Sequence, residues 1–168
     1  MIYKILRHGA DALHHPSALV TNFTPEIQSL IDDMVQTMYS ENGIGLAAPQ
    51  IGVTLRIFVV DLSVGKNIDD LITFVNPILT KEEGTQLEEE GCLSLPGFNE
   101  KIIRPEKATV TGLNREGDSH TIEATGLLAR AFQHEIDHLD GKLFVDYISA
   151  LKRTRIRHKL EKDQKKTT

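Results

Sequence analysis

The segment His134-Glu135-Ile136-Asp137-His138 constrains this chain more than any other feature of its sequence. Histidines four residues apart lie on one face of a helix, about one turn from each other. Both imidazoles can therefore reach one metal ion, and the glutamate between them is placed to handle a proton on metal-bound water. The pattern predicts a helix that carries a metal site, and it does not select the metal.

The helix that this site requires extends from about residue 125 to residue 139. Leu127 and Ala131 precede His134 and His138 at helical spacing, so an apolar stripe continues into the two histidines. We therefore expect the two histidines to face the interior of the protein.

A catalytic metal site usually has three protein ligands and an open position for water. The residues after His138 offer no recognisable third ligand, whereas the only cysteine, Cys92, lies upstream in Glu90-Gly91-Cys92-Leu93-Ser94. A thiolate is a strong ligand for Fe(II), Zn, Co or Ni. We expect Cys92 to complete the ligand set. A single cysteine also excludes an intrachain disulfide and is typical of a reducing, cytoplasmic setting.

The stretch from Gly43 to Gln50 is rich in small residues, which let a backbone approach a substrate closely. The amide of Gln50 can donate a hydrogen bond to an oxyanion. Taken alone, the same stretch is also compatible with a simple loop that ends a helix.

The remaining sequence predicts strands and helices that occupy separate parts of the chain, which favours an α+β domain. We expect a single domain over residues 1–168, and no internal repeat or linker divides it. The expected elements are a helix from Thr24 to Glu41, strands over Leu55–Asp61 and Leu71–Leu79 (Pro77 indicating an edge or a bend), a hairpin of Lys107–Leu113 and His120–Ala124, and a last helix from about Ser149.

Composition excludes several classes of protein. No apolar run approaches the ~20 residues of a membrane helix, so we expect no membrane partner. Aromatic residues make up only 5% of the chain, which argues against stacking on nucleic-acid bases, and we expect no DNA partner. Eight basic and two acidic residues follow Tyr147, whereas acidic residues dominate the rest. This basic tail, about residues 149–168, indicates a polyanionic partner.

Three segments together make the chain resemble the peptide deformylases. They are Gly43-Ile-Gly-Leu-Ala-Ala-Pro-Gln50, Glu90-Gly-Cys-Leu-Ser94 and Gln133-His-Glu-Ile-Asp-His138, and their order and separation also match that family. The resemblance implies a small α+β fold in which antiparallel strands surround the metal helix. It also implies hydrolysis of the N-formyl group of formyl-methionyl nascent peptides, with release of formate.

The resemblance also implies roles for single residues. The metal ligands are Cys92, His134 and His138, the metal is Fe(II) in the cell, and Ni, Co or Zn can replace it. Hydroxide on the metal attacks the formyl carbon, and Glu135 is the general acid and base. The side chain of Gln50 and the backbone N–H of Leu93 stabilise the oxyanion.

The family pattern further suggests which residues bind the substrate, chiefly around the methionine side chain: Ile44, Gly45, Glu90, Gly91, Leu127 and Ala131. Two positions depart from that pattern. Arg130 stands where many relatives carry an apolar residue. Asn99 stands near the position where some bacterial members carry an arginine that contacts the peptide. Some bacterial members are also thought to dock on ribosomal RNA near the peptide exit through a C-terminal helix, which the basic tail fits.

Two other hypotheses remain open at this point. A zinc endopeptidase sharing only the helix motif requires a third ligand other than Cys92. A ribosome- or RNA-binding module with a structural metal requires four protein ligands, because structural sites usually fill all four positions. The three candidate ligands favour a catalytic site.

Overall fold

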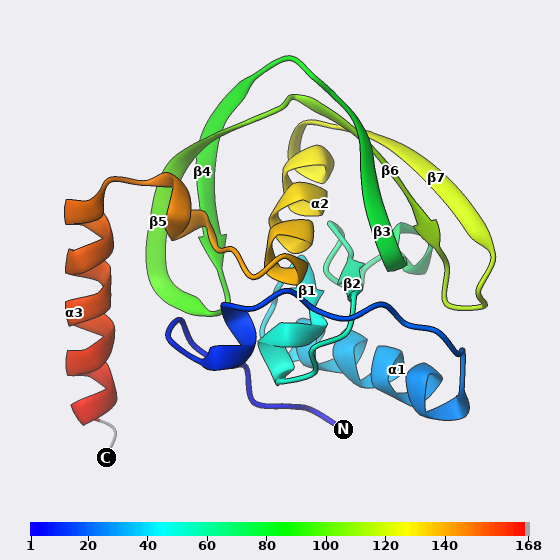
Figure 1. Ribbon diagram of the computed structural model, residues 1–168, viewed down its shortest axis with the longest axis horizontal. Coiled ribbons are helices and arrows are strands. Elements are labelled where there is room, and N and C mark those ends of the chain that lie inside the picture. Colours follow the sequence, from blue (N-terminus) through cyan, green and yellow to red (C-terminus); the bar gives the residue numbers. More distant parts are fainter. Residues whose placement is uncertain (167–168) are drawn as a thin grey trace.

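Antiparallel strands surround a central helix in the computed structural model, which describes residues 1–166 (Figure 1). The helices are α1 (Pro25–Ser40), α2 (Gly126–Leu139) and α3 (Ala150–Lys166). The strands are β1 (Gly45–Ala47), β2 (Ile57–Val60), β3 (Ile72–Glu83), β4 (Gln86–Cys92), β5 (Leu95–Arg104), β6 (Lys107–Leu113) and β7 (Ser119–Thr125). Short 3-10 helices occupy Asp11–Leu13, Ala48–Ile51, Ile68–Asp70 and Phe144–Tyr147.

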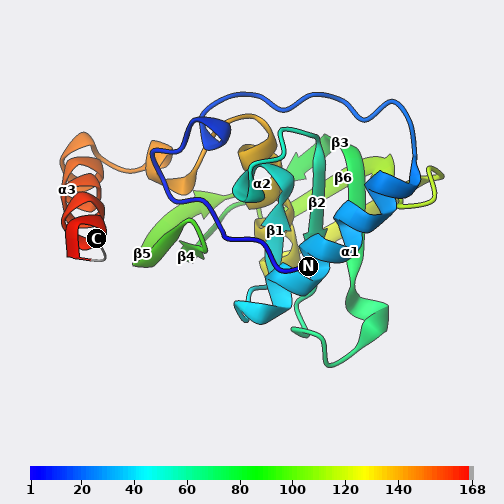
Figure 2. The same ribbon diagram turned by 90° about the horizontal axis from the view of Figure 1, so that it is seen from below.

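The strands form two sheets. Five strands in the order β1-β2-β3-β6-β7 make an antiparallel sheet, and β4 and β5 make a separate antiparallel pair. Helix α2 lies between the two sheets (Figure 1), and α1 lies across the other face of the larger sheet (Figure 2). This arrangement confirms the predicted α+β fold with strands around the metal-motif helix.

The short strand β2 shows why the two helices can occupy opposite faces. All four of its residues are buried. Phe58 and Val60 pack in the cluster that contains Phe132 of α2, whereas Ile57 and Val59 pack with the core of α1. A strand covered on both faces reads as a continuous apolar run rather than an alternating one.

Three predicted elements agree closely with the structure. The Thr24 hydroxyl accepts a hydrogen bond from the backbone N–H of Ile27 at 3.3 Å and caps α1, and Pro25 is its first residue. Helix α2 spans nearly the whole predicted segment, and β6 and β7 form the predicted hairpin.

Other expectations need correction. The strand predicted over 71–79 is the longer β3, and it lies inside the sheet between β2 and β6 rather than at an edge. The alternative of a bend is supported, because the pairing with β6 is irregular between Val75 and Ile78, on either side of Pro77. The stretch from Gly43 to Gln50 is more than a loop, since it contains β1 and the start of a 3-10 helix. Strands β4 and β5 were not predicted at all.

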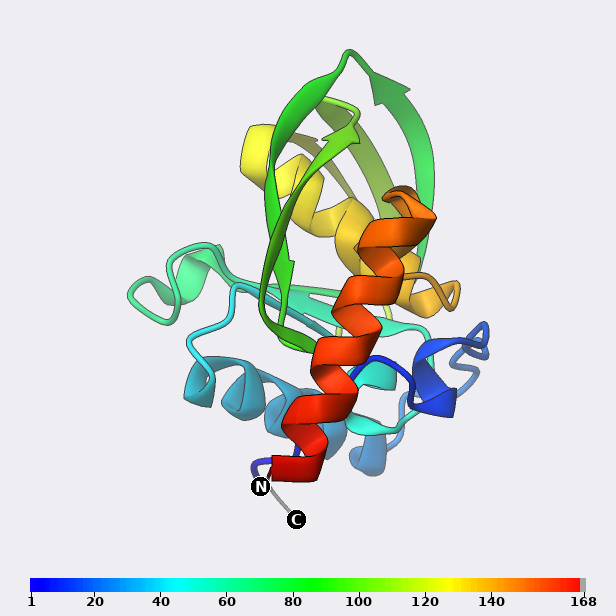
Figure 3. The same ribbon diagram turned by 90° about the vertical axis from the view of Figure 1, so that its left-hand side faces the viewer.

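The last helix packs at the periphery of the fold. Helix α3, drawn in red and orange, lies in front of the rest of the fold in Figure 3. Among its residues with described burial, the buried ones are Ile156 and Leu160, and they join a cluster that includes Leu95 of β5 and Phe144. The ammonium group of Lys159 lies 5.1 Å from the centre of the Phe98 ring. Among the described residues, no helix combines the length and apolar character needed to cross a membrane.

Candidate metal centre

Three possible metal ligands converge from two elements. Helix α2 presents His134 and His138 on one face, and an irregularity in the β4–β5 pairing after Gly91 accompanies the turn at Cys92. The Nε2 atom of His138 lies 3.2 Å from both the Sγ atom of Cys92 and the Nε2 atom of His134. All three ligand atoms lie within 4.8 Å of one another, so the structure brings together the residues singled out by the sequence.

This cluster fits a divalent transition metal. Ligand atoms with bonds of about 2.0–2.3 Å to one tetrahedral ion must lie within a few ångströms of each other, as these do. Burial lowers the pKa of His138 well below its ordinary value, so its ring is neutral, as a ligand must be. A buried carboxylate oxygen next to the cluster, Oε2 of Glu135, has no hydrogen-bond partner among the described residues.

Glu135 is held close to the cluster and away from solvent. Its side chain is almost completely buried, and its Oε1 atom lies 4.0 Å from Nε2 of His134. Burial raises the pKa of Glu135 to about 7, and the proximity of His134 only partly opposes this shift. A Cβ atom at Gly45 would lie 2.7 Å from Oε1 of Glu135, so only glycine allows this approach of β1 to α2.

Gln50 is fixed with its N–H₂ group toward the cluster. Its Oε1 atom accepts a hydrogen bond from the backbone N–H of Ala47 at 2.9 Å. Its Nε2 atom donates to Oγ of Ser94 at 3.2 Å and lies 3.6 Å from Sγ of Cys92. Sequence reasoning did not select Ser94, although it belongs to the same motif as Cys92 and is completely buried.

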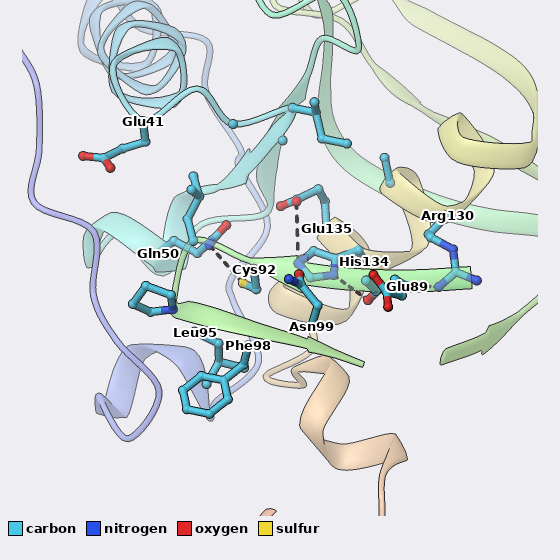
Figure 4. A pocket seen from close by; sticks show the side chains of 18 of the residues that line it. Glu41, Gln50, Glu89, Cys92, Leu95, Phe98, Asn99, Arg130, His134 and Glu135 are labelled. Carbon is cyan, nitrogen blue, oxygen red and sulfur yellow. Dashed lines mark hydrogen bonds and ion pairs between the residues drawn. The ribbon is translucent and has the colours of Figure 1, made fainter. Parts of the chain in front are cut away.

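A cavity of about 470 Å³ opens beside the cluster (Figure 4). Its walls include every residue proposed from the sequence for substrate binding, together with Gln50, Leu93, Arg130 and Asn99. Leu127, the first residue of the apolar stripe, is 55% exposed, whereas His134 and His138 are buried as expected. Leu127 stands on the first turn of α2, at the open side of this cavity. Oδ1 of Asn99 lies directly over Gly91, where any Cβ atom would clash.

A buried cluster of charged residues lies next to the candidate ligand His134. Arg104 donates to both carboxylate oxygens of Glu90 at 2.7 and 2.6 Å and to Oδ2 of Asp137 at 2.8 Å. Oε2 of Glu90 also lies 2.7 Å from Nδ1 of His134. Although burial alone would raise it, hydrogen bonds with Arg104 and His134 hold the pKa of Glu90 well below its ordinary value. Glu90 is therefore ionised.

Sequence reasoning missed Arg104. The one available signal is strand alternation, since Arg104 falls on the same face as Ile102, which is buried. That signal requires β5 to be recognised first. Glu90 does line the cavity, as expected, but its carboxylate is engaged with Arg104 and His134.

An α+β fold that encloses a Cys-His-His cluster beside a buried glutamate has the groups that a metal-dependent hydrolase requires. The sequence pattern of polypeptide deformylases matches residues 2–154. The chain is 48% identical to a peptide deformylase of Acidobacterium capsulatum (98% of this chain, 97% of the relative) and 50% identical to one of Thermodesulfovibrio yellowstonii (95% and 97%). The solved structure of a peptide deformylase from Legionella pneumophila superposes with a TM-score of 0.94 at 46% identity (99% and 98%).

The chain therefore belongs to the polypeptide deformylase family, whose members are hydrolases that act on formyl-methionyl peptides. A peptide deformylase of Ehrlichia chaffeensis, solved in complex with actinonin, has a TM-score of 0.90 at 35% identity (96% and 97%). The zinc endopeptidase hypothesis required a third ligand other than Cys92. Among residues 1–166, the group that can hold a metal joins the two histidines to Cys92.

Proposed function

We propose that this chain removes the N-formyl group from the N-terminal formyl-methionine of newly synthesised polypeptides and releases formate. The observation that carries the proposal is the convergence of Cys92, His134 and His138 beside the buried, unpartnered oxygen of Glu135. Family membership supplies the substrate class.

Sγ of Cys92 and the Nε2 atoms of His134 and His138 would hold the metal, which we take to be Fe(II) in the cell, with Ni, Co or Zn as substitutes. Such an ion, when bound, supplies Lewis acidity and lowers the pKa of coordinated water toward neutrality. Imidazole nitrogens and a cysteine sulfur are donors that these ions prefer.

Glu135 serves as general base and then as general acid. It accepts a proton from the attacking water and passes that proton to the amine of the leaving methionine. A pKa raised to about 7 suits both directions of this transfer near neutral pH. Its closeness to His134 keeps the carboxylate within reach of a water at the ligand cluster.

Two donors stabilise the negative charge that develops on the formyl oxygen. The Nε2 group of Gln50 is held beside the cluster by the Ala47 and Ser94 hydrogen bonds, so it is already close to the reacting group before the reaction. The backbone N–H of Leu93 is the second donor. Each such donor is typically worth about 3–4 kcal/mol.

The methionine side chain lies in the cavity beside the cluster, against Ile44, Leu127 and Ala131, while Gly45 and Gly91 let the peptide backbone approach closely. Glu90 acts differently from the other lining residues. It lines the cavity, and its carboxylate also contacts Nδ1 of His134 and orients that ring.

The test is formate release from a formyl-Met tripeptide by anaerobically purified, Fe(II)- or Ni(II)-loaded protein, with the acetyl-Met analogue as control. We expect release from the formyl peptide and none from the acetyl peptide. No release from protein shown to hold one metal per chain would overturn the proposal.

We further propose that the chain works in the cytoplasm and contacts ribosomal RNA through the basic face of α3. Arg153, Arg155 and Lys162 are exposed on this helix, and neutralising all three leaves its buried residues in place. Phosphate contacts weaken as salt rises. A combined Arg153→Gln, Arg155→Gln, Lys162→Gln variant should bind ribosomes more weakly and with a shallower salt dependence. Unchanged ribosome affinity would exclude this role for the helix.

A further inference from the structure

Arg130 is a buried cation on the helix that carries the ligands. It lies four residues before His134 on α2, and only 3% of its surface is exposed. Its Nε atom donates to Oε1 of Gln86 at 3.1 Å, Nη1 donates to Oε1 of Glu90 at 2.9 Å, and Nη2 donates to the carbonyl of Ile102 at 2.7 Å. These bonds tie α2 to both β4 and β5.

Each carboxylate oxygen of Glu90 contacts two polar partners. Oε1 accepts from Arg104 and from Arg130, while Oε2 accepts from Arg104 and contacts Nδ1 of His134. Rotation of this carboxylate would break several charge-assisted hydrogen bonds at once. The direction in which Oε2 faces His134 is therefore set by the two guanidinium groups.

The two arginines reach Glu90 from different elements, and each also bonds to the other's element, Arg104 to Asp137 of α2 and Arg130 to Ile102 of β5. Arg104 belongs to β5, and its remaining contacts are with Asp137 and the Tyr147 ring. Arg130 stands on α2 itself, one helical turn before His134, so it fixes the carboxylate relative to the ring that the carboxylate contacts.

We propose that Arg130 is a positioning residue for the metal ligand His134, acting through Glu90. A carboxylate that accepts the Nδ1 proton of His134 selects the tautomer in which Nε2 is free to bind a metal, and it fixes the plane of the ring. Without Arg130, Oε1 of Glu90 loses a buried donor and the carboxylate gains freedom to turn. This inference rests on the metal site proposed above.

Charge alone makes the opposite prediction. Arg104 and Arg130 balance Glu90 and Asp137, so removing Arg130 leaves an excess negative charge behind the site. A divalent cation would then be attracted more strongly. The sign of the change in metal affinity therefore separates positioning from simple electrostatics.

The experiment measures the dissociation constant of cobalt(II), by competition with a chelator, and the visible spectrum of the full-length cobalt-loaded protein. We expect Arg130→Met to weaken cobalt binding about tenfold, within the range typical of residues that support metal ligands, and to shift the cobalt bands. Arg130→Lys keeps the positive charge but lacks the planar guanidinium group with its several donors, so it should weaken cobalt binding by a smaller factor. Arg56→Met is the matched control, because Arg56 pairs with Asp140 and the Leu139 carbonyl near the other end of α2.

Equal or tighter cobalt binding by folded Arg130→Met, with unchanged bands, would overturn the proposal, even if the variant melts at a lower temperature. If Arg130→Met does not fold, Arg130→Lys decides: an unchanged dissociation constant and spectrum overturn the proposal. The metal site itself predicts that the wild-type protein binds one cobalt ion and shows a thiolate band that is absent from Cys92→Ser. If the wild-type protein shows neither, the metal site is contradicted.

Discussion

Helices α2 and α3 differ most in where their polar side chains lie. In α2, five polar or charged residues are buried: Arg130, Gln133, His134, Glu135 and His138. Among the residues of α3 whose burial is described, the buried ones are the apolar Ile156 and Leu160, and most of the cations face water. Burying a polar group costs free energy unless it finds a partner. A helix that buries several polar groups therefore marks a site, whereas the exposed charges of α3 indicate only attraction to a polyanion.

The largest difference should appear when a histidine of each helix is removed. His138→Ala deletes a ligand atom that lies 3.2 Å from two others, so metal binding and formate release should fall to background. His158→Ala on the exposed face of α3 is the matched control and should change neither. Metal content and formate release are measured on both variants. Equal behaviour of the two variants would refute the assignment of the site to α2.

The addition of one methyl group to β1, which faces α2, should have the next largest effect. In Gly45→Ala, the new Cβ atom would meet Oε1 of Glu135 at 2.7 Å, so the carboxylate must move. A displacement of about 1 Å at a catalytic group can cost about a hundredfold in rate. We expect kcat to fall by about that factor while metal content stays at one per chain. An unchanged kcat would show that the position of Glu135 is not critical.

Removal of a buried charge outside α2 should lower the stability of the fold and leave the reaction rate unchanged. Asp61 is completely buried and accepts hydrogen bonds from Tyr39, Ser63 and Gly65. Although burial opposes it, these bonds hold the pKa of Asp61 below its ordinary value. We expect Asp61→Asn to lower the free energy of unfolding at pH 7 by roughly 1–3 kcal/mol.

This contribution depends on pH with a definite sign. A carboxylate with a lowered pKa stabilises the fold above the pKa of the unfolded state, near 3.9, and the stabilisation is lost as pH falls through the folded-state pKa. The difference between wild type and Asp61→Asn should shrink below about pH 4. Urea unfolding at pH 7 and pH 3 measures it, and a constant difference would contradict the prediction.

The smallest effect should come from the exposed charges of α3. The combined Arg153→Gln, Arg155→Gln, Lys162→Gln variant should keep kcat/KM on a formyl-Met tripeptide within about twofold, and each change should shift stability by less than about 0.5 kcal/mol. A large loss of activity on this short peptide would show that α3 takes part in the reaction.

The same contrast explains how much could be predicted from the sequence. Helix α2 and its histidines follow from local spacing, and α1 follows from its cap and apolar period. Cys92 could be added because it is the only thiol and the histidine pair lacked a third ligand. These inferences succeed because the decisive residues lie a few positions apart or are unique in the chain.

The β4–β5 pair and the buried cluster of charged residues could not be predicted in this way. Strand β4 contains Glu88, Glu89 and Glu90, which are poor strand formers, and two of the three are exposed. The partners of Glu90 lie 14, 40 and 44 residues away, at Arg104, Arg130 and His134. Only tertiary packing brings these charges together, so the role of Glu90 emerges from the structure alone.

The most direct test compares one glutamate of each helix in the same assay. Formate release from a formyl-Met tripeptide is measured with metal-loaded Glu135→Gln and with Glu161→Gln, whose side chain is exposed on α3. General acid–base catalysis contributes about 10²–10⁴-fold, so Glu135→Gln should lose activity in that range while Glu161→Gln matches the wild type. A metal-loaded Glu135→Gln protein that retains most of its activity would contradict the account.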